Sequence, residues 1–465
     1  MYEDIVNFCV DYASKKVDFV EARLEINRSE GFVLKNGVPE VSAFSNSRGI
    51  GLRIIDNKTL GFVAINEFNK DRIKKLIDKG ISLTKSVSKI KQEINFSDEK
   101  VNVDNYEVKQ KKSFFDIHPE EKINSLLEVD KSIDHVNNRY FSLSVNENEK
   151  YLINSEGTKI KSVIPRVSIY YLLTLLANKK SMQRYWQHGA CGGWESFEKW
   201  NLRETVRKEV DEIKQVMEKG KKITPGKMDL IVDPEVTGIM THESVGHPYE
   251  ADRILGRESA QAGESFVNPD MLNTQIGSEV VNVSDDPTVP NNFGFYLYDD
   301  EGVKARRRRL IKDGKINEFL HNRQTAFELG TKSNGSARAC VYNVENLVRM
   351  SNTFVDKGDH SKEELIEGVK KGILMKNFVE WNIDDVRLNQ KYTACVAYLI
   401  ENGKIKGLVF EPTIEITTPK LWSSVDAVGN NNEYHAATCG KGEPMQGIPV
   451  FHGGPSIRIR NVNIR

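Results

Sequence analysis

The sequence lacks an excess of either charge. Its 465 residues include 66 Lys and Arg and 66 Asp and Glu, so the formal net charge at pH 7 is zero. A protein dedicated to nucleic acid or to an anionic membrane needs a basic surface. We therefore expect no nucleic-acid partner and no membrane partner. The basic run Arg306–Arg309 is predicted to lie in a solvated hairpin, because alternate side chains of a strand point to opposite faces.

Long apolar runs and abundant cysteine are also missing. The run "VSIYYLLTLLA", at 167–177, is far shorter than the roughly 20 residues that cross a bilayer, and we expect it to form a buried pair of strands. The opening "MYEDIVNFCVDYASKK" mixes acids among its apolar positions, unlike a secretory signal. Five scattered cysteines favour reduced thiols over a disulfide framework. These features predict a cytoplasmic protein.

The chain length favours two domains, joined at the segment "KKITPGK". Residues 1–225 are predicted to form an N-terminal α/β domain with a mixed or antiparallel sheet and a charged surface connection near 87–119. Residues 226–465 are predicted to form a C-terminal catalytic domain that is β-rich and largely antiparallel. We thus expect an α/β protein of the α+β type, in which a helix of the second domain holds the candidate site.

Two helices have clear end signals. A charged helical pattern runs from Leu202 to about Lys219 and stops at Gly220. After the apolar strand "MDLIV", Asp233 is predicted to be a helix N-cap and Pro234 the first helical residue. The motif that follows therefore begins on a helix.

That motif, "THESVGHPYEAD", places His242 and Glu243 ahead of a second histidine, His247. In the common zinc-peptidase motif H-E-x-x-H the two histidines are four residues apart and share one helical face. Here the spacing is five, which rotates the second ring away on a regular helix of 3.6 residues per turn. Gly246 relaxes the backbone and Pro248 disfavours helical geometry at His247. We predict a widened turn or a broken helix end that brings the two rings together.

The spacing does not identify the third protein ligand of such a site. A catalytic zinc ion usually takes three protein ligands and leaves one position for water. The candidates are the remaining histidines, the carboxylates Glu250 and Asp252, and any cysteine in a turn. Cys439 lies in the glycine-flanked turn "HAATCGKGEPMQ", whereas Cys9 and Cys395 have apolar neighbours and are predicted to be core thiols. The spacing alone is equally compatible with polar residues that cap a helix end and face solvent.

The motif and three later segments, "YDDEG", "LIKDGKI" and "ATCGKGEPMQGIPVFHGGPSIRI", resemble the TldD/PmbA family of modulator-of-gyrase, zinc-dependent peptidases. The N-terminal "EARLEINRSEGFVLKNGVPEVSAF" also follows the family's opening pattern, so the resemblance covers most of the chain. It implies that His242, His247 and Cys439 hold one zinc ion and that Glu243 is the general base toward a zinc-activated water. The departures, around "PYEA" and "GEP", concern loop shapes rather than these residues.

The resemblance also implies a function and partners. Catalytic TldD-type members cleave unfolded or extended peptides inside a closed dimer, so we expect a peptide substrate and a homodimer or a heterodimer with a related chain. The alternative is a non-catalytic peptide-binding or assembly subunit of a TldD/PmbA-type complex, which retention of all four residues argues against. The substrate-binding residues are not identified. His188 and His435 are expected to be ordinary, partly buried histidines rather than contributors to the site.

Overall fold

A long, curved sheet, sheet A, occupies the first half of the chain in this computed structural model, which describes residues 2–88, 93–258 and 263–465. Its order is β3-β2-β1-β5-β6, and β4 and β7 both pair with the far edge of β6. All neighbours are antiparallel except β4 and β6. The strands are β1 (Phe19–Lys35), β2 (Val38–Asp56), β3 (Thr59–Ile65), β4 (Val103–Glu107), β5 (Asn138–Asn154), β6 (Lys159–Ala177) and β7 (Lys180–Cys191).

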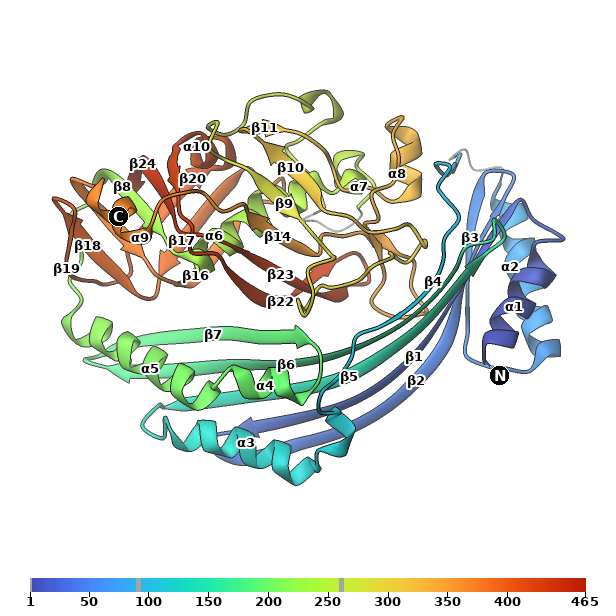
Figure 1. Ribbon diagram of the computed structural model, residues 1–465, viewed down its shortest axis with the longest axis horizontal. Helices are drawn as coiled ribbons and strands as arrows, with labels where there is room; N and C mark the ends of the chain where they lie inside the picture. The colour runs from blue at the N-terminus through green and yellow to red at the C-terminus, as the bar shows by residue number, and fades with distance from the viewer. Residues whose placement is uncertain (1, 89–92, 259–262) are drawn as a thin grey trace.

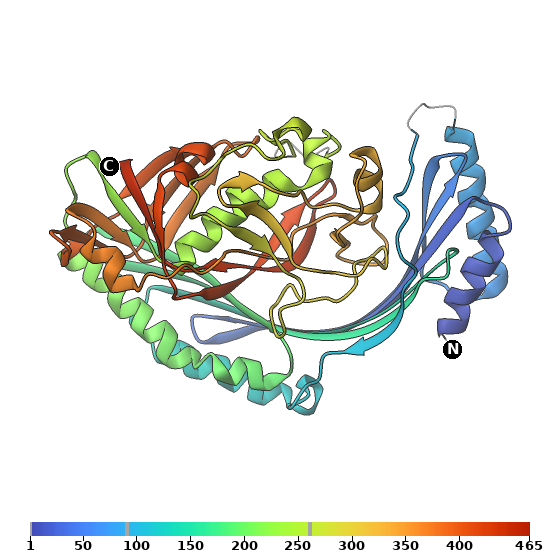
Figure 2. The same cartoon turned by 45° about the horizontal axis from the view of Figure 1, so that its top comes forward.

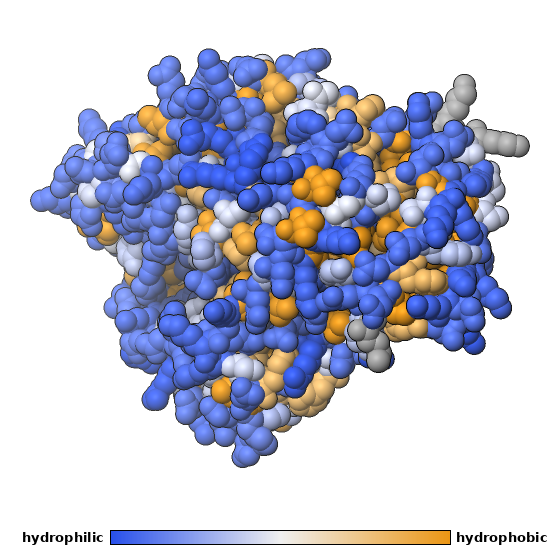
Figure 3. All heavy atoms as spheres, turned by 45° about the vertical axis from the view of Figure 1, so that its right-hand side comes forward, coloured by the Kyte–Doolittle hydropathy of each residue, from blue (hydrophilic) through white to orange (hydrophobic). Residues whose placement is uncertain are grey.

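Helices cover the convex face of sheet A at both ends, and the second half of the chain lies against its concave face (Figures 1 and 2). On α5, Val206, Val210 and Ile213 are buried, and their spacing places them on one helical face toward the sheet. Seen from the side of α1 and α2, the surface is mostly hydrophilic with scattered apolar groups (Figure 3). The helices are α1 (Tyr2–Ala13), α2 (Lys70–Val87), η1 (Phe114–Asp116), α3 (Pro119–Lys131), α4 (Trp194–Lys199) and α5 (Leu202–Lys219).

Two sheets, B and C, and the short pair β12–β13 form the second half. Sheet B has the order β16-β17-β20-β24-β8-β15-β18-β19, with β21 paired to β24, and sheet C has the order β11-β10-β9-β14-β23-β22. Each contains one parallel pair, β8 with β15 in sheet B and β14 with β23 in sheet C. The strands are β8 (Gly226–Val232), β9 (Val283–Asp285), β10 (Arg308–Lys312), β11 (Lys315–Ile316), β12 (Ala337–Arg338), β13 (Leu347–Val348), β14 (Asn352–Val355), β15 (Lys371–Met375), β16 (Phe378–Ile383), β17 (Asn389–Ala394), β18 (Ala397–Glu401), β19 (Lys404–Val409), β20 (Thr413–Thr417), β21 (Val425–Val428), β22 (Glu433–Lys441), β23 (Gln446–Gly454) and β24 (Ile457–Ile464).

The helices of the second half are short. The first of them, α6, follows β8 and packs against β14, β22 and β23 of sheet C. Within the described ranges, no helix is both long enough and apolar enough to cross a membrane. The helices are α6 (Pro234–Thr241), η2 (His242–Gly246), η3 (His247–Tyr249), α7 (Ala251–Ile254), η4 (Pro269–Met271), α8 (Arg323–Glu328), α9 (Lys362–Glu367) and α10 (Thr418–Ser423).

The protein is therefore of mixed α/β class and consists mostly of strands, with a sheet A that is antiparallel apart from β4 and a mixed sheet B. The predicted helices at 202–219 and from Pro234 are confirmed. The predicted pair of strands at 167–177 is wrong, because this run belongs to the single 19-residue strand β6. From Val167 to Leu175 buried residues alternate with half-buried ones, so one continuous strand has apolar side chains on both of its faces without a turn. The division at 225/226 stays a prediction.

The basic run Arg306–Arg309 lies beside carboxylates. Arg306 forms an ion pair with Glu318 (2.7 Å), and Arg307 forms one with Asp356 (2.6 Å). The hairpin predicted here is confirmed for β10 and β11, which meet at "KDGK", while the segment before β10 is irregular. The prediction that the whole run is solvated is wrong, because Arg308 is fully buried. Much of the positive charge of this run is thus compensated within the molecule.

Arg308, in the same run, is a structural residue. Its side chain and that of Asp285 are fully buried and form an ion pair, and Asp285 also accepts hydrogen bonds from Ser351 Oγ (2.7 Å) and Thr353 Oγ1 (2.7 Å). Asp285 ends β9, Arg308 begins β10, and Thr353 lies in β14. The pair therefore ties together three strands of sheet C.

Replacing Arg308 with Leu should destabilise the protein by about 3–5 kcal/mol, because it leaves the buried Asp285 carboxylate without its cation. The neighbouring Arg309 is exposed, so Arg309→Leu should change stability by less than about 0.5 kcal/mol. Urea unfolding followed by fluorescence compares the two variants. Equal midpoints for both would contradict a structural role for the buried pair.

Candidate metal centre

The candidate motif lies where helix α6 changes its winding. After the regular turns of α6, residues His242–Gly246 form one wide π turn, in which the amide of His247 donates to the carbonyl of His242. Ser244 contributes, since its Oγ donates to the carbonyl of Met240 (2.5 Å) and competes with the backbone ladder. The predicted widened turn is thereby confirmed.

The reasons for the wide turn differ in part from those expected. His247 keeps helical dihedral angles (φ −63°, ψ −47°), so the departure from α geometry predicted at this residue is wrong. Gly246 is also helical, and a side chain there would have its Cβ 2.6 Å from the sulfur of Met350. The glycine is therefore required by close packing rather than by an unusual backbone angle.

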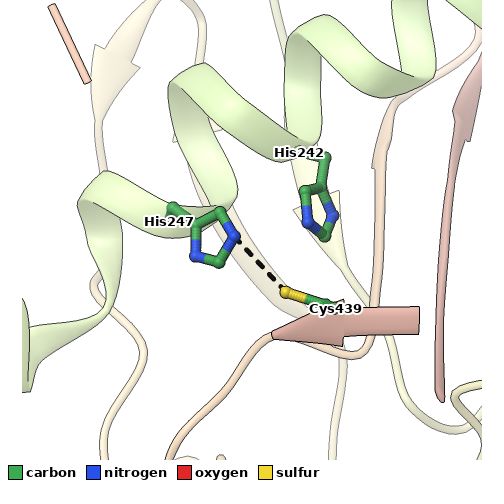
Figure 4. Close-up of side chains that lie close together, drawn as sticks. All are labelled: His242, His247 and Cys439. Carbon is green, nitrogen blue, oxygen red and sulfur yellow. Dashed lines mark hydrogen bonds between the residues drawn. The ribbon is translucent and has the colours of Figure 1, made fainter. Parts of the chain in front are cut away.

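The wide turn brings both histidines to one cysteine. The ligand atoms of His242, His247 and Cys439 all lie within 4.8 Å of one another, and all three residues are buried. The Sγ of Cys439 is 3.3 Å from Nε2 of His247, and the two imidazole rings are 4.9 Å apart and nearly perpendicular (Figure 4). Cys439 comes from β22, 192 positions after His247.

A buried carboxylate orients the second histidine. Glu250 Oε2 is 3.1 Å from Nδ1 of His247, which leaves Nε2 directed at Cys439. Burial alone raises the pKa of Glu250, but the positive charges of Lys441, His247 and Arg253 hold this pKa well below its usual range. A carboxylate behind a ligating histidine is the usual arrangement in metal sites. Glu250, one of the residues left open as a third ligand, thus lies behind His247.

Cys439 is prepared to act as a thiolate. Burial raises the pKa of its thiol, but the neighbouring His247 and Arg349 lower it, to about 7. Arg349 also donates to the backbone carbonyls of Cys439 (2.5 Å) and Gln446 (2.9 Å), which fixes the β22–β23 hairpin in position. By contrast, burial raises the pKa of Cys9 to about 12. All five cysteines are free thiols.

Glu243 lies on the same cavity as the cluster and has an arginine partner. The cavity, about 200 Å³ in volume, is lined by His242, Glu243, His247, Cys439 and Arg387. Arg387 Nη1 is 2.6 Å from Oε2 of Glu243, and the arginine comes from the turn before β17, where its φ is +65°. No feature of the sequence links these two residues, which are 144 positions apart.

The donor set fits a metal ion. Nδ1 of His242 is buried without a hydrogen-bond partner, so no hydrogen bond competes with a metal ion at this nitrogen. Two histidines and a thiolate are the ligand types that zinc prefers. Asp252, the other carboxylate considered as a ligand, instead accepts from Lys441 Nζ (2.6 Å). His242, His247 and Cys439 are thus the residues able to hold the ion.

Three further histidines lie near the cluster without joining it, and of these only His452 lines its cavity. His188 packs between Tyr171 and Trp200, and burial lowers its pKa to about 4. His435 faces Trp186, and burial lowers its pKa to about 3. His452, which the sequence did not single out, has its ring 6.0 Å from that of His242. These rings form a neutral aromatic wall.

Comparison with known proteins places the chain in a family. Three models of the PmbA/TldA metallopeptidase match it: domain 1 over residues 20–84, the central domain over 112–215, and the C-terminal domain over 225–465. The C-terminal match alone covers more than half of the chain and includes the whole cluster.

Relatives match over nearly all or about half of the chain. A metalloprotease of Methanocaldococcus jannaschii is 31% identical over 95% of this chain and 96% of its own. A zinc metalloprotease TldD homologue of Saccharolobus solfataricus is 31% identical over 54% of this chain and 55% of its own. TldE from Thermococcus kodakarensis has the same fold, with a TM-score of 0.73 at 17% identity over 100% of this chain and 99% of that one. The chain belongs to the PmbA/TldD metallopeptidase family.

Proposed function

We propose that the protein is a zinc-dependent metallopeptidase that cleaves unfolded or extended peptides. The observation that supports this most strongly is the buried cluster of His242, His247 and Cys439, with the Glu243 carboxylate on the same cavity. The ligand types favour zinc, and one relative is named a zinc metalloprotease. In this proposal residues 226–465 form the catalytic domain.

The chemistry divides between the metal and the side chains. A bound zinc ion would act as a Lewis acid that polarises the scissile carbonyl and lowers the pKa of an attacking water. Glu243 accepts the proton of that water at its carboxylate and later donates it to the leaving amine. Arg387 holds this carboxylate through the 2.6 Å ion pair, so that the base is in place before substrate arrives. The cavity is buried, which strengthens each of these electrostatic contacts.

An extended peptide fits the strand edges beside the cluster. β22 is the last strand of sheet C and β7 is an edge strand of sheet A, and residues of both line the site cavity. The two strands are joined by a hydrogen bond between Gln187 Nε2 and Thr438 Oγ1 (3.1 Å). Main-chain pairing with such an edge binds a peptide with little dependence on its sequence.

We propose, further, that the chain works as a dimer with itself or with a related chain. The outer half of β2, residues 38–48, pairs with β1 on one side, while β3 pairs with the inner half. On this half Val38, Val41 and Phe44 are 60%, 48% and 61% exposed. An apolar strand edge of this kind is a ready surface for pairing with another chain.

Metal content tests the proposed ligands. The purified protein should contain about one equivalent of zinc, and Cys439→Ser should weaken zinc binding at least about 100-fold, since even residues behind a ligand contribute 10–100-fold. The matched control is Cys340→Ser, which removes a thiol outside the cluster and should keep the zinc. Elemental analysis measures both proteins. Equal zinc in the two variants would remove Cys439 from the site.

Glu243→Gln tests the general base. The amide has the same shape but cannot take a proton, so kcat for hydrolysis of an unfolded peptide should fall by about 10²–10⁴-fold while zinc stays bound. The exposed Glu363 of α9 provides the control, because Glu363→Gln should change neither quantity. Undiminished cleavage by the Glu243 variant would exclude this role.

Sedimentation tests the dimer. Phe44→Glu places a charge on the exposed strand edge and should weaken self-association at least about tenfold if that edge is the interface. The control is Leu83→Glu, which alters a side chain on α2 that is 57% exposed. If the protein is a monomer alone, the same pair of variants is compared with a related family member present. An unchanged assembly in the Phe44 variant would rule out this edge.

A further inference from the structure

A second cavity lies beside the metal centre. It has a volume of about 220 Å³ and is enclosed between the concave face of sheet A and the β22–β23 hairpin. Its lining is polar and includes Asn146 and Arg166 from sheet A and Tyr296 and Arg338 from the second half of the chain. Thr438, next to Cys439, lines both this cavity and the metal-centre cavity. The two cavities therefore adjoin at Thr438.

Two arginines of this cavity have no carboxylate partner. Arg166 donates to two backbone carbonyls of the 293–295 segment (3.0 and 3.1 Å), and Arg338 donates to one carbonyl before β14 and one in β23 (2.9 Å each). Among the described residues, no carboxylate forms an ion pair with either guanidinium. The carbonyls orient these groups but carry no negative charge to pair with them.

The acids that line the same cavity are already engaged. The carboxylate of Asp299 accepts hydrogen bonds from three backbone amides at 2.9–3.0 Å. Asp300 accepts from Lys150 Nζ (2.8 Å) and from the amide of Ala339 (2.8 Å). Neither acid is available to neutralise Arg166 or Arg338.

The electrostatics of Arg338 agree with this geometry. Burial lowers its pKa to about 10, and the positive charges of Arg166 and Arg349 lower it further, while Tyr296 and Asp300 act in the opposite direction. Arg184 is as deeply buried, but it lies between Glu209 and Glu235, and their charges raise its pKa. A buried cation without a counter-ion is costly, so an anion that enters the cavity gains both the charges and the free guanidinium donors.

We propose that this space, the arginine cavity, binds a carboxylate of the peptide chain close to the scissile bond. The inference rests on the proposed peptidase function. The shared residue Thr438 is next to Cys439, so a carboxylate in this cavity belongs to a substrate residue near the scissile bond. The volume is below the ~300 Å³ of the smallest drug-sized sites, which suits one side chain or a chain end. The carboxylate can belong to an acidic side chain or to the C-terminus.

Matched peptides test the inference on the zinc-loaded protein. A short fluorescent peptide of Ala, Ser and Val is made with one central Glu or Gln, and with a free or amidated C-terminus, in all combinations. If a carboxylate of the peptide binds an arginine of the cavity, the peptide that carries it should have a kcat/KM roughly 10–100-fold higher than the matched peptide with an amide at that position. The Glu-over-Gln pair reports on a side chain, and the acid-over-amide pair reports on a terminus. Equal kcat/KM within both pairs would overturn the proposal.

Two further measurements separate the outcomes. Arg166→Gln should bring the carboxylate-to-amide ratio close to one, whereas Arg309→Gln, which changes an exposed arginine, should keep it. Peptide binding to the metal-free protein, followed by fluorescence anisotropy, should show the same preference without turnover. If no peptide is cleaved, the peptidase proposal fails, and anisotropy alone decides on the cavity. If peptides are cleaved and bound without preference, only the arginine cavity is wrong.

Discussion

The candidate site depends on the close contact between helix α6 with its wide turn and sheet C. At Gly238 a Cβ would lie 2.4 Å from the His452 ring, and at Gly246 it would lie 2.6 Å from the sulfur of Met350. Larger residues at these two positions would push the helix away from β14 and β23. Because β22 is paired along its whole length with β23, this packing also sets the distance between Cys439 and His247. The geometry of the cluster thus follows from backbone packing, which is stiff.

Buried charge surrounds this contact and is handled in two ways. Around His247, the carboxylate of Glu250 meets Arg253 and Lys441, so the charges are paired and the histidine ring has one orientation. In the arginine cavity, Arg166 and Arg338 donate to backbone carbonyls, and no carboxylate in the described part of the chain forms an ion pair with them. The first arrangement fixes groups in place for chemistry, while the second leaves an unsatisfied charge that a ligand can satisfy. The difference separates a supporting cluster from a binding cavity.

Local patterns predicted much of the secondary structure. The ends of α5 and the start of α6 follow from charged periodicity and from the Asp233-Pro234 pair, which act within a few residues. Even so, the Asp233 side chain caps no amide and instead bonds Lys362 and Ser456, which are distant in the chain. The run 167–177 forms one strand rather than the predicted two, because its apolar residues alternate between a buried and a half-buried face of the same strand.

The sequence by itself determined the residue types of the site and the need for a wide turn, since two histidines five residues apart share one face only where the helix is wound more widely than an α-helix. The resemblance of the later motif then selected Cys439 from several possible ligands. Only the tertiary structure decided that Arg387 contacts Glu243 and that the arginine cavity adjoins the metal centre. These contacts join residues more than a hundred positions apart, and packing rather than local backbone chemistry places them together.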